Sequence, residues 1–124
     1  MNLKTLFVIT AVVAFIFGLG FILAPTASMR LYGVTLDASG QFLGRYLGAA
    51  FIGFAFLAWL CRNADVSMAH KAVVTAFFVA TILGFIVALY DKFAGTGNAL
   101  VWLNVIIYLF LAIGFGYFRF AKSG

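Results

Sequence analysis

The sequence has little charge and few reactive side chains: one proline, one histidine and one cysteine, and only 9% of its 124 residues are charged. Cys61 is alone, which excludes an intrachain disulfide, a CxxC redox pair and a cysteine-cluster metal site. Eight Lys and Arg and three acidic residues are too few to cover the surface of a water-soluble domain of this size. These scarcities exclude an ordinary soluble globule.

Apolar residues are correspondingly abundant, at 66% of the chain, with sixteen Phe and thirteen Gly. Soluble domains have roughly 45–50% apolar residues. So many aromatic residues and so few charges also exclude a disordered chain. The cations occur singly at the ends of apolar segments, which is typical of membrane proteins, so we expect a lipid bilayer and no nucleic acid as the partner.

Four apolar runs cover residues 6–23, 42–60, 72–90 and 100–118. As helices they are about 27–28 Å long, close to the roughly 30 Å hydrocarbon core of a bilayer. Backbone amides have no water to bind there, so the runs must be helical. The sequence predicts an all-α polytopic membrane protein, a single transmembrane domain over 1–124 that forms an up-down four-helix bundle. The first run exceeds the usual length of a signal-peptide core, so we expect it to be retained.

The cations predict the orientation of the bundle. With four spans both termini lie on one side, which carries Lys4, Arg62, Lys71, Arg119 and Lys122. The other side carries Arg30, Arg45 and Lys92. The positive-inside rule therefore predicts cytoplasmic termini and, for a bacterial protein, location in the inner membrane.

The connection over residues 24–41 is the only one with room for structure of its own. A proline opens it, which predicts a short interfacial helix over 25–32 that ends at Gly33. Asp37 or Ser39 is expected to cap the second span. This helix is interpreted either as a cover over the bundle or, preferably, as a helix that fills a loop.

Small residues at four-residue spacing predict where helices pack in lipid. The second run carries Gly40, Gly44 and Gly48, with Ala49 and Gly53 beside them. The longest such ridge, on the third run, is Ala72, Ala76, Ala80, Gly84 and Ala88. We expect that ridge to be buried in the bundle, with most Phe residues facing lipid or filling gaps.

Arg45 is the only charge well within an apolar run, and such groups mark functional sites in membranes. It shares four-residue spacing with Gln41, Ala49 and Gly53, which predicts that it faces the bundle. Asp91 and Asn104 are expected at similar depth, with Tyr108 one turn further in. The predicted ligand-binding residues are Arg45, Gln41, Asp91, Asn104 and Tyr108, which form a polar pocket in the outer leaflet.

Arg45 also has structural interpretations. It can pair with Asp91 or Asp37 to hold helices together, or extend to the lipid headgroups. In the pocket interpretation its guanidinium binds a carboxylate, a phosphate headgroup or a quinone carbonyl.

No catalytic pattern accompanies these residues. The sequence has no Ser-His-Asp set, no paired carboxylates and no metal-ligand spacing, and His70 is expected to be a solvated loop residue. We therefore expect a protein that is not an enzyme and has neither a metal nor a cofactor.

The residues Leu-Tyr-Gly-Val at 31–34 and Arg-Tyr-Leu-Gly-Ala at 45–49, with Pro25 and Gly40, resemble a group of small bacterial four-helix membrane proteins. That group is loosely similar to DoxX-like proteins and is functionally uncharacterised. The resemblance implies the four-helix fold and draws attention to Arg45, but it implies no activity. The Cys and Glu residues of some DoxX-like redox proteins are absent here, which disfavours an oxidoreductase. A small multidrug transporter is also disfavoured, because the chain has no membrane-embedded glutamate.

Two functions follow from these observations. The first is an accessory or assembly subunit without catalytic chemistry, which packs against other membrane proteins or self-associates. The alternative is a binding or transport module that takes a lipid-like or quinone-like amphiphile into a pocket around Arg45. An enclosed cavity beside Arg45 would favour the second, and a flat apolar face of the size of a partner protein on the fourth span would favour the first.

Overall fold

The computed structural model describes residues 2–65 and 67–121, and all regular structure in these ranges is helical. The elements are α1 (Leu3–Leu23), α2 (Pro25–Arg30), α3 (Ala38–Cys61), α4 (Met68–Ala94), α5 (Val101–Gly116) and a π-helical turn η1 (Tyr117–Ala121). Four helices, with η1 counted as the end of α5, are long and apolar enough to cross a membrane. The predicted all-α four-helix bundle is confirmed.

Polar side chains fix where three of the long helices begin. Asn2, Asp37 and Ser67 each accept a hydrogen bond from the backbone amide three residues later, over 2.8, 2.7 and 3.2 Å. These bonds satisfy amides that have no partner within the helix. At the other end of α4, Gly95 adopts φ +83°, the left-handed conformation that terminates helices. Asp37 was one of the two caps expected for α3.

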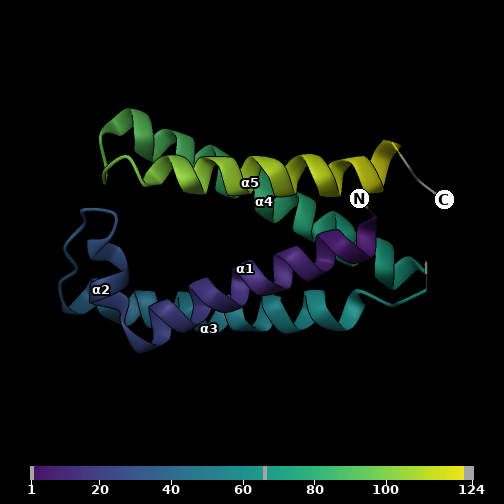
Figure 1. Cartoon of the computed structure of the whole chain (residues 1–124), viewed down its shortest axis with the longest axis horizontal. Helices are drawn as coiled ribbons and strands as arrows, with labels where there is room; N and C mark the ends of the chain where they lie inside the picture. Colours follow the sequence, from purple (N-terminus) through teal and green to yellow (C-terminus); the bar gives the residue numbers. More distant parts are fainter. Residues whose placement is uncertain (1, 66, 122–124) are drawn as a thin grey trace.

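The long helices are arranged as two pairs, α1 with α3 and α4 with α5 (Figure 1). The start of α1 and the end of η1 both lie at the end that we call proximal, at the right of Figure 1. The opposite, distal end carries α2 and the connections over 31–37 and 95–100. The two pairs approach each other most closely at the proximal end, where α1 contacts α5.

Glycines bring α1 and α3 together. A Cβ atom added to Gly48 would lie 2.8 Å from the carbonyl oxygen of Gly18, closer than real Cβ atoms come. A Cβ on Gly18 would in turn lie 2.7 Å from the side chain of Ile52. In lipid, where no hydrophobic effect drives helices together, this backbone approach supplies the packing energy.

The proximal core is aromatic. Phe7, Phe77 and Phe115, from α1, α4 and α5, contact one another with ring centroids 5.2–6.1 Å apart. Phe115 is fully buried and stacks on Phe77 at an interplanar angle of 15°. The ring of His70 completes the cluster in a T-shaped contact with Phe7, with ring centroids 5.8 Å apart. These rings join the two helix pairs at one end only.

Two expectations about these surfaces are wrong. Ala72 and Ala76 are exposed, so the ridge of α4 is not buried along its length; larger residues, such as Val74 and Phe77, face the bundle there instead. His70 lies inside the first turn of α4 and is buried among rings rather than solvated. The expectation for the Phe residues is confirmed: Phe77 and Phe115 fill the space between helices, whereas others, such as Phe110, are exposed.

Candidate functional site: a cavity at the distal end

A cavity of about 670 Å³ separates the two helix pairs toward the distal end. Residues of α1, α3, α4 and α5 line it, and so do residues of the connection over 25–37, which we call the cover segment. Small-molecule sites typically have volumes of about 300–1,000 Å³. The cavity therefore has the size of a ligand site and lies between the elements that the proximal core holds together.

The walls of the cavity are apolar over most of their area. Side chains from α1 and α3 supply four aromatic rings: Phe17, Phe21, Phe51 and Phe54. The hydroxyls of Thr10 and Thr81 also lie on the walls, but each donates to a backbone carbonyl of its own helix, over 2.9 and 2.7 Å. Their polarity is therefore satisfied, and the walls offer a ligand little but apolar contact.

Polar groups gather at the distal end of the cavity. The Tyr32 hydroxyl, from the cover segment, donates to Asn104 Oδ1 on α5 over 2.6 Å. A second bond, from Asn98 Nδ2 to the carbonyl oxygen of Leu31 at 3.0 Å, ties the cover segment to the connection before α5. Burial raises the pKa of the Tyr32 phenol above its ordinary value, which already lies well above neutral pH, so the protonated phenol remains the donor in this bond.

Two further groups line the same cavity. Tyr108 stands one turn from Asn104 on α5, and its ring occupies the space left by the missing side chain of Gly84. Its hydroxyl has no hydrogen-bond partner within the described part of the chain. Asp91 lines the cavity from α4. It is the only charged residue among those described along the cavity wall.

We infer that the cavity opens to the lateral surface of the bundle between α3 and α4, because lining residues of both helices are exposed. Leu47 and Phe54 of α3 line the cavity, yet 47% and 45% of their surface is exposed. Ala80 of α4 likewise lines the cavity and is exposed. Because exposed faces of spanning helices contact lipid in a bilayer, a molecule dissolved in the membrane can reach the cavity from the side.

The structure corrects the expected position of Arg45. Its side chain is exposed, is absent from the cavity wall, and has no partner among the described residues, so neither Asp91 nor Asp37 pairs with it. The reason is the glycine before it: Gly44 and Gly48 define the face of α3 that packs inward, and one residue turns a helix by about 100°. Arg45 thus lies on the flank, where its long side chain suits the headgroup region.

The remaining predicted residues fall into two groups: three that line the cavity and one that does not. Asp91, Asn104 and Tyr108 line one cavity, whereas Gln41 is half-buried and does not line it. The sequence placed Tyr32 only at the end of the interfacial helix predicted over 25–32 and did not predict its bond to Asn104. One feature of the sequence could have indicated this bond: the proline at the start of the cover segment, which folds over the bundle and brings Tyr32 to α5. In the described ranges no three His, Cys, Asp or Glu lie close enough to hold a metal ion.

Comparison with known proteins identifies the family. The model of a domain of unknown function, DUF8292, matches residues 8–122, so the chain belongs to that family. No curated protein and no solved structure matches significantly. The family is uncharacterised, as the sequence resemblance implied, and the cavity has to be interpreted from its own chemistry.

Proposed function

We propose that this integral membrane protein binds a lipid-like or quinone-like amphiphile in the distal cavity. The observation that carries the proposal is the cavity itself: an apolar chamber of about 670 Å³ with a cluster of polar groups at one end. An amphiphile has the same two-part character. Its apolar chain would lie along Phe17, Phe51 and Phe54, and its polar head beside Asn104 and Tyr108.

The lateral opening between α3 and α4 supports entry from the bilayer. Water-soluble ligands would have to pass the cover segment, which two hydrogen bonds hold to α5 and the connection before it. A membrane-dissolved molecule meets exposed apolar side chains and no such barrier. The proposal assigns no chemical reaction to the cavity and needs no cofactor.

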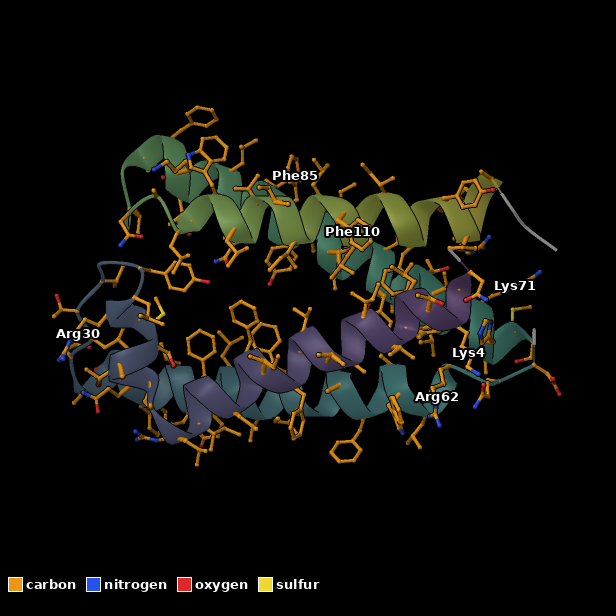
Figure 2. All side chains as sticks on the ribbon, viewed as in Figure 1. Lys4, Arg30, Arg62, Lys71, Phe85 and Phe110 are labelled. Carbon is orange, nitrogen blue, oxygen red and sulfur yellow. The ribbon has the colours of Figure 1, made fainter. Side chains whose placement is uncertain are left out.

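Photolabelling in bilayer nanodiscs tests this function. The purified protein in phosphatidylcholine nanodiscs would be irradiated with a dodecanol that carries a diazirine on its chain, and labelled residues would be mapped by mass spectrometry. We expect saturable labelling at Phe51 and Phe77, which line the cavity, and its loss in the presence of excess unmodified dodecanol. Phe110, which is exposed on α5 outside the cavity (Figure 2), serves as the control for non-saturable contact with bulk lipid. Non-saturable labelling at all three positions would contradict the proposal.

An accessory role is the competing function. It predicts that the protein co-purifies with another membrane protein or with itself, and that cavity residues are labelled no more specifically than Phe110. The same nanodisc preparation, analysed for its protein content, distinguishes the two functions.

We also propose that the proximal end faces the cytoplasm. Lys4, Arg62 and Lys71 gather at this end, while Arg30 lies at the other (Figure 2). In a bacterial inner membrane, a periplasm-dependent reporter fused after residue 124 should be inactive, and the same reporter inserted within 95–98 should be active. The reverse pattern would overturn the orientation.

A further inference from the structure

We infer that the cavity selects an amphiphile with a cationic head, such as an alkylammonium, over one with an anionic head. This inference rests on the proposed function and names the chemical class of the ligand. It reverses the expectation from the sequence, in which Arg45 would have made the pocket a site for a carboxylate or a phosphate.

The charge of the cavity wall carries the inference. Asp91 lines the cavity from α4, and none of the described lining residues is Lys, Arg or His. Asp91 has no ion pair or side-chain hydrogen bond within the described part of the chain, so its carboxylate is not neutralised by a neighbour. In an apolar cavity an unpaired charge has a large effect on which ligand charge is accepted.

Two aromatic residues that line the same cavity as Asp91 favour the same sign of charge. Tyr32 and Tyr108 line the cavity, and aromatic rings carry electron-rich faces. A cation near such faces is attracted by the ring quadrupole, most strongly where water is excluded. An anion would meet the same faces and the carboxylate of Asp91 unfavourably.

Arg45 does not offset this charge. The guanidinium lies on the flank of α3 and outside the cavity wall, so the nearest cation on that helix is turned away from a bound head. The chain as a whole carries a net charge of +5. The charge on the cavity wall is therefore opposite in sign to the net charge of the protein. A preference for cations cannot arise from the overall charge.

Three probes with one chain length test the inference. Dodecylamine, dodecanol and dodecanoate would compete with the diazirine-bearing dodecanol for saturable labelling of Phe51 and Phe77 in phosphatidylcholine nanodiscs at pH 7. Each competitor's concentration in the bilayer would be corrected by its partitioning into empty nanodiscs. We expect dodecylamine to compete about tenfold more strongly than dodecanoate, with dodecanol between them.

A matched pair of variants assigns the preference to one carboxylate. Asp91→Asn should abolish the advantage of dodecylamine over dodecanol while leaving competition by dodecanol within about twofold. Asp65→Asn makes the same change in charge at an exposed position of the proximal connection and should leave the order unchanged.

Two results would overturn the inference: dodecanoate competing as well as dodecylamine, or Asp65→Asn altering the order as much as Asp91→Asn. Saturable labelling that all three probes reduce equally would refute the charge preference and leave the proposed function standing. Absence of saturable labelling would instead refute the proposed function, on which this inference rests.

Discussion

The space between the two helix pairs is filled differently at the two ends of the bundle. At the proximal end, Phe7, Phe77 and Phe115 fill the space between the helix pairs with stacked and tilted rings. At the distal end the corresponding space holds no such cluster and is an apolar cavity closed by the cover segment. The contrast shows that ring packing joins the helix pairs at the proximal end. At the distal end, hydrogen bonds of the cover segment join them and a cavity remains between them.

The glycines on α1 and α3 explain how the open end persists. Their backbones meet at Gly18 and Gly48, so α1 packs on α3 rather than closing against α5. Close packing within each pair replaces close packing between the pairs. The cavity is thus a consequence of where the small residues lie.

Removing an aromatic ring from the proximal end should have the largest effect. Phe115→Ala deletes a fully buried ring and its stack on Phe77, and we expect the free energy of unfolding to fall by about 3 kcal/mol. Unfolding in mixed dodecyl maltoside and SDS micelles measures it. Phe110→Ala, at a ring that is 43% exposed on the same helix, should cost well under half as much. Equal losses would mean that the proximal cluster does not hold the pairs together.

Widening the crossing of α1 and α3 should have an intermediate effect. Gly48→Ala would place a Cβ 2.8 Å from a backbone oxygen of Gly18, and backbone has little room to yield, so we expect a loss of about 1–3 kcal/mol in the same assay. Gly53→Ala on the same helix is the control, because no atom lies within 4 Å of its added Cβ. That change should be neutral or slightly stabilising. A Gly48→Ala protein as stable as Gly53→Ala would refute the close crossing.

Loosening the cover segment should have the smallest effect on stability. Tyr32→Phe removes the bond to Asn104, and we expect a loss of about 1 kcal/mol. Amide hydrogen exchange over 31–37 should accelerate, while exchange at the proximal end stays unchanged. Tyr46→Phe removes a hydroxyl that is exposed on α3 and should alter neither quantity. Unchanged exchange in Tyr32→Phe would show that this bond does not hold the cover segment.

The fold was predictable because length and hydropathy alone set the spans. Lipid requires helices, and four apolar runs leave few ways to connect them. The N-cap of α3 and the short helix α2, which begins at a proline, were also predictable, because capping depends on adjacent residues. In contrast, which face of α4 turns inward depends on neighbours distant in sequence, and the rings of Phe77 and Phe115 outweigh an alanine ridge.

The candidate site was predictable in part for the same reason. Asp91, Asn104 and Tyr108 could be grouped by depth, because depth follows directly from position in a span. Arg45 was misplaced because four-residue spacing fits two neighbouring faces of α3, and only the contact of Gly48 with Gly18 selects between them. The resemblance to DoxX-like proteins stays a prediction, as does the accessory role.

Native mass spectrometry of the protein released from mild detergent tests the central claim, occupancy of the distal cavity, most directly. Ala76 and Ala80 form a matched pair: both are exposed on α4, one turn apart, and only Ala80 lines the cavity. We expect the wild-type protein and Ala76→Trp to retain one bound amphiphile and Ala80→Trp, whose indole would fill the cavity, to lose it. Retention of the same amphiphile by all three proteins, or by none, would contradict the account.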